Sequence, residues 1–316
     1  MNLLLEVLWL LVTTIYFCLE AFVKLFAPVK RKSVRGETVL VTGAGHGIGR
    51  LTAYEFAKRQ SKLVLWDINK HGIEETAEEC RKLGAEAYAF VVDCSKREKI
   101  YSAAEKVKSQ VGDVSILVNN AGIVVAADLM ATEDHEITKI FEVNILAHFW
   151  TTKEFLPAMM SINHGHIVTV ASACGLSTLP FLVSYCSSKF AAVGFHKTLT
   201  QELAALGKDG IKTSCLCPVI VNTGFVKNPS QRLLPLLEPE HVANTLMEGI
   251  LTNQKMIIVP PILNVLLMLE RLLPERAIAG VSRLFEVKFD VAVGCKDKGK
   301  QVGTLSIVIS YTKSNS

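Results

Sequence analysis

Apolar and polar positions along the chain form blocks that predict strands and helices in alternation. Short apolar runs of strand length occur in ETVLVTGAG, KLVLWDIN, AYAFVVDCS and VSILVNNAG, and stretches with helical spacing follow them. The repeated order of strand and helix predicts a parallel sheet with helices on both faces. We therefore expect an α/β fold, a doubly wound parallel sheet, over residues 37–260.

The second half of this region continues the alternation. The run FEVNILAHFWTTKEFLPAMM is predicted to form one long amphipathic helix that carries Asn144. A buried parallel strand is expected in HIVTVAS, a helix in FAAVGFHKTLTQEL, and a last strand that closes the sheet in MIIVP. The final run VGTLSIVISYTKSNS alternates like a strand, and a disordered or variant tail is an equal alternative for residues 301–316.

Residues 1–26 are nearly all apolar, and their uncharged run Val7–Leu19 is short for a bilayer crossing of about 20 residues. A signal peptide would need a basic start and a small-residue cleavage site, which this stretch lacks. A core helix is the other alternative, but a basic cluster over residues 30–35 follows at once, as it does beside membranes. We expect residues 1–28 to be a monotopic or hairpin anchor and residues 29–36 a basic linker. The cluster predicts that the following domain faces the cytosol.

Composition narrows the class of protein. Half of the 316 residues are apolar, and the mean hydropathy of +0.33 is high for a soluble enzyme. The net charge of +4, without aromatic residues among basic clusters, argues against nucleic acid as a partner. None of the eight cysteines is spaced as C-x-x-C, so we expect neither a metal site nor disulfides. Such a chain is typical of the reducing cytosol.

A glycine-rich turn follows the first predicted strand. Thr42 is followed by Gly43, Gly47 and Gly49, a spacing that lets a pyrophosphate approach the start of a helix. The second strand ends at Asp67, eighteen residues after Gly49. A carboxylate there can accept both ribose hydroxyls of NAD and would repel the 2′-phosphate of NADP. The alternative is that Asp67 serves only as a turn residue.

The stretch Ser172–Lys189 combines groups that suit proton transfer. Tyr185 and Lys189 are four residues apart, so on a helix they share one face. A nearby ammonium favours the phenolate and would lower the tyrosine pKa from roughly 10. Ser172, at the end of the preceding strand, would present a hydroxyl to the same space. The alternative is an ordinary surface tyrosine and lysine.

Three further polar residues lie where parallel strands end or where a helix would bury them. Asp93 ends the third predicted strand, and Asn120 follows the fourth, at the edge where ligands bind in such sheets. Asn144 in the middle of a helix is mildly unfavourable, which indicates a specific role. A satisfied structural asparagine is the alternative for Asn144.

These motifs, in this order and spacing, resemble the short-chain dehydrogenase/reductase family over residues 37–260. The resemblance implies a Rossmann-like domain. Within the family the chain is most similar to the lipid-droplet 17-beta-hydroxysteroid dehydrogenases of types 11 and 13, through runs such as LVLWDINK, FEVNILAHFWTTK and YCSSKFAAVGFHKTLT. One departure is Pro218-Val219, where the family usually has Pro-Gly.

The resemblance implies a role for each matching residue. Tyr185 would take the substrate hydroxyl proton, Lys189 would lower the Tyr185 pKa and hold the nicotinamide ribose, and Ser172 would bind the reacting oxygen of the substrate. Asn144 would support a water relay behind Lys189. NAD is the implied cofactor, and the residues expected to bind it are Gly43, Gly47, Ile48, Gly49, Asp67, Asp93, Asn120, Tyr185, Lys189, Val221 and Thr223.

The resemblance also implies a function and a location. We expect NAD-dependent oxidation of a lipophilic alcohol, such as a 17-beta-hydroxysteroid, retinol or a lipid alcohol, by a homodimer at lipid droplets and the endoplasmic reticulum membrane. Residues 224–258 would cap the substrate pocket. Residues 261–300 are expected to be an apolar helical segment that serves as core, dimer contact or second lipid-facing patch. The competing hypothesis is a non-catalytic lipid-droplet surface protein with an inherited dehydrogenase fold.

Overall fold

The structure is a computed structural model that divides the chain into two compact units, residues 1–33 and residues 34–316. The residues that it describes are 3–24, 29–232, 236–274, 277, 287–295 and 299–307.

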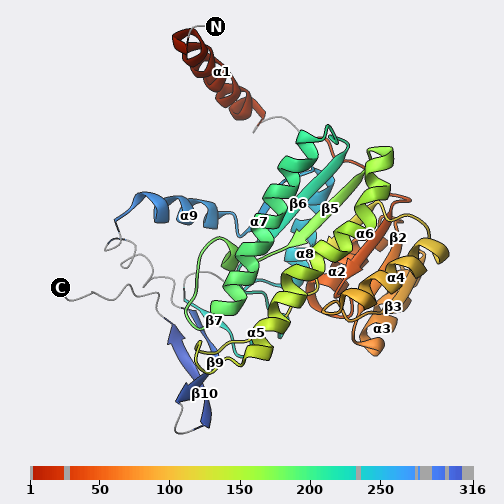
Figure 1. Ribbon diagram of the computed structural model, residues 1–316, viewed down its shortest axis with the longest axis vertical. Helices are drawn as coiled ribbons and strands as arrows, with labels where there is room; N and C mark the ends of the chain where they lie inside the picture. The colour runs from red at the N-terminus through yellow and green to blue at the C-terminus, as the bar shows by residue number, and fades with distance from the viewer. Residues whose placement is uncertain are drawn as a thin grey trace. The chain divides into compact units, whose positions relative to one another are not determined.

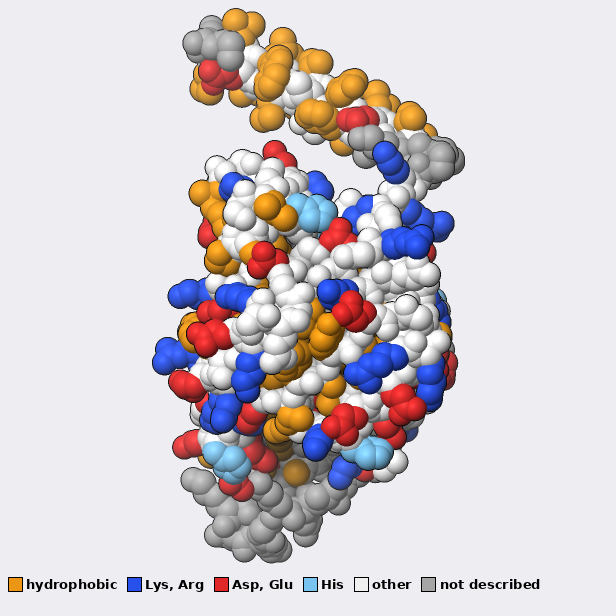
Figure 2. Space-filling view, turned by 90° about the vertical axis from the view of Figure 1, so that its right-hand side faces the viewer, with side chains coloured by type: hydrophobic (Ala, Val, Ile, Leu, Met, Phe, Trp, Pro, Cys, Tyr) orange, Lys and Arg blue, Asp and Glu red, His pale blue; other side chains and the backbone are white. Residues whose placement is uncertain are grey.

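The first unit contains one helix, α1 (Leu3–Lys24). Its apolar side chains are exposed all around it, and Figure 2 shows them as hydrophobic along its length. Over Leu3–Glu20 this helix is long and apolar enough to cross a membrane. At 1.5 Å per residue, its 22 residues extend for about 33 Å. The N-terminal apolar helix could therefore anchor the protein to a membrane.

The second unit is built on a seven-stranded sheet in which every pair of neighbours is parallel, in the order β3-β2-β1-β4-β5-β6-β8. Its strands are β1 (Thr38–Thr42), β2 (Lys62–Asp67), β3 (Ala87–Val91), β4 (Ile116–Asn119), β5 (Gly165–Val170), β6 (Ile211–Pro218) and β8 (Met256–Val259). The order reverses between β1 and β4, which is the point where ligands bind in open parallel sheets. The doubly wound Rossmann-like fold expected from the sequence is confirmed, including the last strand.

Helices cover both faces of this sheet, as Figure 1 shows. The residues that these helices bury pack into two large apolar clusters, one on each face. One face carries α2 (Gly47–Ala57), α3 (Lys70–Lys82) and α8 (Pro239–Leu251), and the other carries α4 (Arg97–Gln110), α6 (Ala147–Ile162) and α7 (Val183–Ala205). The short 3-10 turn η2 (Ala173–Gly175) connects β5 to the loop before α7.

The helix expected over residues 141–160 contains a π-helical turn. The chain forms α5 (Asp134–Phe141), then a π-helical turn, η1 (Glu142–Leu146), and then α6. A π turn widens the backbone by one residue and is frequent at functional sites. The predicted long helix is therefore confirmed as continuous helical backbone, and the addition is a π turn that contains Asn144.

A second, three-stranded sheet of order β10-β9-β7 lies beside the first, with antiparallel pairs. Its strands are β7 (Ser230–Gln231), β9 (Val287–Cys295) and β10 (Gly299–Ile307). The expectation that residues 261–300 are helical is therefore wrong for β9 and the start of β10. The alternating tail forms a strand, β10, as far as Ile307. Residues 308–316 lie outside the described residues.

The cap predicted over residues 224–258 also needs correction. Only its first part, with Phe225, Val226 and Arg232, lines the cavity, whereas α8 and β8 belong to the large sheet and its core. Two elements outside the predicted cap also contribute to the cavity wall: α9 (Ile262–Leu272) and β9. Strand β9 reaches the cavity wall because it pairs with β7, which lies next to the cavity.

Candidate active site

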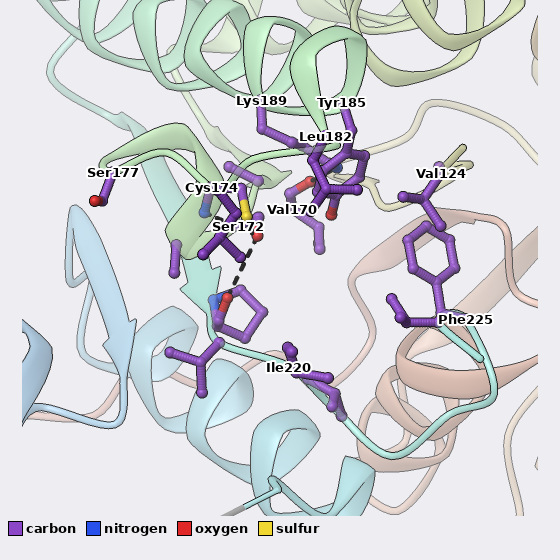
Figure 3. Close-up of a pocket in the computed structure, with 18 of the residues that line it drawn as sticks. Val124, Val170, Ser172, Cys174, Ser177, Leu182, Tyr185, Lys189, Ile220 and Phe225 are labelled. Carbon is purple, nitrogen blue, oxygen red and sulfur yellow. Dashed lines mark hydrogen bonds between the residues drawn. The ribbon is translucent and has the colours of Figure 1, made fainter. Parts of the chain in front are cut away.

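A cavity of about 420 Å³ opens at the carboxyl ends of the parallel strands. The glycine turn after β1 and the ends of β2 and β4 lie on one side, and the β5 end, η2 and α7 lie on another. Figure 3 shows Ser172, Tyr185 and Leu182 around the same space, opposite Ile220 and Phe225. Of the predicted site residues, those that line the cavity are Gly43, Gly47, Ile48, Asp67, Asn120, Ser172, Tyr185, Lys189, Val221 and Thr223.

The glycine turn is fixed by contacts that no side chain would permit. Gly43 has φ of +67°, and a Cβ there would lie 2.9 Å from Cα of Ala121. A Cβ on Gly49 would lie 2.2 Å from the Gly43 oxygen, so Gly49 allows this approach without itself lining the cavity. The Asn120 side chain donates to the oxygens of Thr42 (2.9 Å) and Gly43 (3.1 Å). These contacts keep the turn open in front of the first turn of α2.

Asp67 lies at the end of β2 and faces this turn. Its Oδ2 accepts a hydrogen bond from the Gly45 amide (2.8 Å), and its Oδ1 accepts one from the Asn69 amide (2.8 Å). The nearby Arg50 guanidinium is engaged by the oxygens of Gly45 and Gly72. The turn, the start of α2 and an acidic residue at the β2 end fit the pyrophosphate and ribose of a dinucleotide.

Ser172, Tyr185 and Lys189 are brought together by η2 and α7, as the sequence predicts. The Ser172 hydroxyl accepts from the Cys174 amide (3.1 Å) and points toward the Pro218 oxygen (3.5 Å), as the dashed line in Figure 3 marks. Lys189 Nζ lies 5.7 Å from the centre of the Tyr185 ring and donates to the Val170 oxygen (3.0 Å). The lysine is therefore held between the end of β5 and the phenol.

The expectation that Lys189 lowers the Tyr185 pKa needs correction. Burial raises the Tyr185 pKa above its ordinary value, and the opposing effect comes from a hydrogen bond with Ser172. Burial also lowers the pKa of Lys189 to about 8. Desolvation disfavours the charged form of each group. Burial is therefore the largest influence on the phenol, while the Lys189 ammonium donates to the Val170 oxygen and lies 5.7 Å from the ring centre.

Asn144 is fully buried and joins two parts of the site without lining the cavity. Its side chain accepts from the Ile123 amide (2.8 Å) and donates to the Ile123 oxygen (2.9 Å) and to Ser188 Oγ (3.0 Å). Ser188 Oγ in turn donates to the backbone carbonyl oxygen of Tyr185 (2.7 Å). A Cβ on Gly122 would lie 3.5 Å from Asn144 Oδ1 and 3.6 Å from Lys189 Nζ, so this glycine leaves a small open space between them.

Asp93, predicted to contact the cofactor, does not line the cavity. Its carboxylate accepts from the amide and hydroxyl of Ser95 and lies 3.4 Å from Lys139 Nζ. These contacts hold the Asp93 pKa below its usual value against the effect of burial. Strand β3 ends at Val91, two residues earlier than expected, which directs Asp93 into the following turn.

The apolar walls of the cavity are mostly residues that motif reasoning misses. Phe225 lies with its ring centre 6.2 Å from that of Tyr185, and Val287 and Phe289 of β9 close another side. The run VKFDVAV alternates apolar and polar residues, which is the signal that could have identified β9 as a half-buried strand. The residues around the reactive phenol thus make a pocket for an apolar molecule.

The chain combines a parallel sheet, a glycine turn after β1, a serine just after β5, and a tyrosine and a lysine in the first two turns of α7. This combination defines a dehydrogenase that uses a nicotinamide dinucleotide. A model of the short chain dehydrogenase family matches residues 37–233, and the chain belongs to this family.

Closely similar proteins carry hydroxysteroid dehydrogenase names. Estradiol 17-beta-dehydrogenase 11 of Rattus norvegicus is 66% identical over 94% of this chain and 100% of the relative. Human 17-beta-hydroxysteroid dehydrogenase 13 is 65% identical over 95% of this chain and 100% of the relative.

Solved structures agree with the fold and the cofactor class. A short chain dehydrogenase/reductase from Burkholderia phymatum in complex with NAD is 27% identical, with a TM-score of 0.70 over 76% of this chain and 94% of that one. An alcohol dehydrogenase from Thermococcus sibiricus complexed with 5-hydroxy-NADP is 25% identical, with a TM-score of 0.64 over 71% of this chain and 95% of that one.

Proposed function

We propose that the protein oxidises a lipophilic alcohol with NAD at a lipid surface. The observation that carries this proposal is the position of Tyr185, Ser172 and Lys189 in one apolar cavity that continues to the glycine turn. Bound NAD would accept a hydride from the carbinol carbon. Tyr185 would accept the hydroxyl proton of the substrate, and Ser172 would hold the reacting oxygen by a hydrogen bond.

NAD rather than NADP is the proposed cofactor because of Asp67. Its carboxylate lies at the β2 end beside the glycine turn, where a ribose hydroxyl can be accepted and a 2′-phosphate would be repelled. Arg50 does not offset this charge, since its guanidinium is bound to Gly45, Gly72 and Glu75. Gly43, Gly47, Ile48 and Asn120 would hold the pyrophosphate side, and Val221 and Thr223 the carboxamide end.

A lipophilic substrate is supported by the walls of the cavity. Phe225, Leu182 and Phe289 surround the space in front of Tyr185. The helix α9 adds four leucine side chains, Leu263, Leu266, Leu267 and Leu269. A 17-beta-hydroxysteroid, retinol and a lipid alcohol all combine a large apolar body with one hydroxyl group. An apolar wall with few polar groups favours such molecules over sugars or small acids.

The lipid surface is proposed to be that of lipid droplets and the endoplasmic reticulum membrane, with the catalytic domain facing the cytosol. The exposed apolar side chains of α1 and the basic residues that follow it support this location. The outer face of α9 is also apolar and exposed, and it suits a second lipid contact. The residues on that face are Ile262, Val265, Met268 and Leu272.

We further propose that the protein is a homodimer. Leu146, Phe149 and Phe190 are exposed on η1, α6 and α7, although they are large and apolar. The Phe149 ring packs edge-on to Phe195, with ring centres 4.9 Å apart, so the two helices present one apolar surface. A second copy of the chain is the partner that this surface would accept.

The test is to measure NADH formation by the purified full-length protein with estradiol, retinol and long-chain secondary alcohols. We expect turnover with at least one of these alcohols and a preference for NAD over NADP at equal concentration. Tyr185→Phe should lower turnover by about 10² to 10⁴-fold while NAD still raises the thermal stability of the variant. Full activity in Tyr185→Phe, or better use of NADP, would contradict the proposal.

A further inference from the structure

Four polar side chains line the cavity outside both the glycine turn and the group around Tyr185. They are Ser177, Thr178, Arg232 and Glu270. In a mostly apolar pocket, a small number of polar groups fixes the orientation of the ligand. These side chains therefore indicate that the cavity recognises more of its ligand than one hydroxyl and an apolar body.

The order of the large sheet makes the cavity elongated, with α9 beyond the reacting centre. Asp67 ends β2, Ser172 follows β5, and α9, which carries Glu270, starts three residues after β8 ends. Five strand spacings separate β2 from β8, and two separate β5 from β8. At about 4.8 Å for each spacing, these separations are about 24 Å and about 10 Å. The reacting centre thus lies between the ribose end and the α9 end of the cavity.

Glu270 is a half-buried carboxylate in the wall that α9 forms. Its Oε1 accepts a hydrogen bond from Ser177 Oγ at 3.5 Å, which is its only hydrogen bond among the described residues. A carboxylate offers about four acceptor positions. One long contact with a hydroxyl leaves most of them open, and the other side chains that α9 adds to this wall are leucines. Glu270 therefore has acceptor capacity for a donor group of a ligand.

Ser177 connects Glu270 to the reacting centre through one short segment. The Ser177 amide donates to the Ala173 oxygen (2.9 Å), and the Cys174 amide donates to the Ser172 hydroxyl (3.1 Å). In the view of Figure 3, Cys174 and Ser172 lie between Ser177 and Tyr185. The segment Ser172–Ser177 thus carries both the hydroxyl beside the phenol and the hydroxyl that contacts Glu270.

Arg232 is the competing charged group in this part of the cavity. It follows directly after β7 and is exposed, and no ion pair joins it to Glu270 among the described residues. The charge of an exposed guanidinium is screened by water and contributes little to binding. Glu270 is the more buried of the two and is held by Ser177. A hydrogen-bond donor on the ligand is therefore favoured over an anionic group.

We propose that Glu270 is a specificity-determining residue that accepts a hydrogen bond from a second hydroxyl group of the substrate, at the α9 end of the cavity. The proposal rests on the proposed alcohol oxidation and narrows its substrate class to lipophilic diols. One hydroxyl of the diol is oxidised at Tyr185, and the other is held by Glu270. Ser177 is a positioning residue for Glu270, and neither residue takes part in the transfer of hydride or proton.

A matched pair of substrates tests the second contact in the wild-type protein. Estradiol carries a phenol at the opposite end from its secondary alcohol, whereas 3-deoxyestradiol lacks that donor and is otherwise identical. We expect kcat/KM for estradiol to exceed that for 3-deoxyestradiol by about tenfold or more, since the lost bond involves a charged acceptor. The difference should lie mostly in KM, because the contact is the same in the ground state and the transition state. Equal kcat/KM values would overturn the proposal.

Variants of the full-length chain assign this preference to Glu270. Glu270→Leu should remove the preference and leave turnover of 3-deoxyestradiol unchanged, and Glu270→Gln, which keeps an acceptor oxygen, should retain part of the preference. Glu105→Gln is the control, because Glu105 is exposed on α4 and does not line the cavity. It should leave the ratio of the two kcat/KM values unchanged.

Two results with these variants would contradict the role of Glu270. If Glu270 serves only as a solvated residue of α9, Glu270→Leu should change the kinetics of both steroids equally and leave their ratio at the wild-type value. That result would overturn the proposal. Better turnover of 12-hydroxystearate than of estradiol by wild type, lost in Arg232→Gln, would also overturn it, in favour of an anionic substrate held by Arg232.

A binding measurement separates failure of this proposal from failure of the proposed oxidation. Both steroids are titrated calorimetrically into the protein saturated with NADH, which prevents turnover of the alcohol. About tenfold tighter binding of estradiol by wild type, lost in Glu270→Leu, would support the diol site even if no alcohol is oxidised, and would then refute only the oxidation. Equal Kd values, or no binding of either steroid, would overturn the diol site whatever the turnover.

Discussion

Burial is the main influence on the pKa values of Tyr185 and Lys189, and this affects the pH dependence of the proposed reaction. In the proposed reaction Tyr185 acts as a base only when it is ionised. Burial raises the Tyr185 pKa, while a hydrogen bond with Ser172 opposes that shift. The ionised fraction at neutral pH is therefore small and rises with pH. Any change that removes the Ser172 hydroxyl should raise the Tyr185 pKa further.

We expect kcat/KM for alcohol oxidation to rise between about pH 6 and pH 10, and Ser172→Ala to shift this rise to higher pH. The kcat/KM profile is the measurement, since it reports the pKa values of the free enzyme. Ser177→Ala is the control, because Ser177 lines the same cavity but bonds to Glu270. A profile of Ser172→Ala that coincides with wild type would contradict the assigned hydrogen bond.

Gly49 and Gly194 make a second test at this scale. A Cβ on Gly49 would meet the Gly43 oxygen at 2.2 Å, so Gly49→Ala should distort the glycine turn and weaken NAD binding at least tenfold. Gly194, in the interior of α7, has nothing within 4 Å of its Cβ position. Gly194→Ala should raise the free energy of unfolding by up to about 1 kcal/mol. Both can be measured by thermal unfolding with and without NAD, and equal effects would contradict the geometry.

Residue identity predicts most of the site because the glycine turn, Asp67, Ser172, Tyr185 and Lys189 each have a chemical reason for their spacing. It does not fix where the Asp93 carboxylate points, because this direction depends on where β3 ends. It also fails for the Tyr185 pKa, because desolvation depends on the walls of the cavity and not on the two residues alone.

At the scale of elements, strands and helices of the large sheet follow from periodicity, since each has one face in a large apolar cluster. The π turn η1 does not, because an apolar pattern that predicts a helix does not distinguish an α turn from a π turn. Strand β9 does not follow from composition, because the apolar run before it favours a helix for the whole segment. Its assignment depends on pairing with β7, which is distant in sequence.

Strand β9 gives a prediction about the cavity wall. Phe289 is 1% exposed and lines the cavity, so Phe289→Ala should cost about 3–5 kcal/mol of stability and raise KM for the alcohol. Val291 is fully buried in the same strand but does not line the cavity. Val291→Ala should therefore lower stability and leave KM unchanged. Steady-state kinetics of both variants distinguish a role in the cavity wall from a role in the stability of β9. An unchanged KM in Phe289→Ala would contradict the placement of Phe289 in the wall.

At the scale of the whole molecule, α1 and the catalytic domain are separate compact units. Deletion of residues 2–28 should release the domain to the soluble fraction, because burying even a few of the α1 leucines in lipid is worth about 1.5–3 kcal/mol each. The melting temperature of the domain should stay within about 2 °C of wild type. Fractionation and thermal unfolding are the measurements. A deletion protein that remains with membranes would assign anchoring to another surface, such as the outer face of α9.

The glycine turn and β9 lie far apart along the chain, so they are synthesised at different times. Residues that line the dinucleotide side of the cavity end at Thr223, whereas Phe289 follows about 66 residues later. At about 5–20 residues per second, a ribosome needs several seconds to cover that distance. A nascent chain can therefore carry its N-terminal apolar helix and a nearly complete nucleotide site before the last wall of its substrate pocket exists. During this interval the apolar side chains that β9 later covers face water.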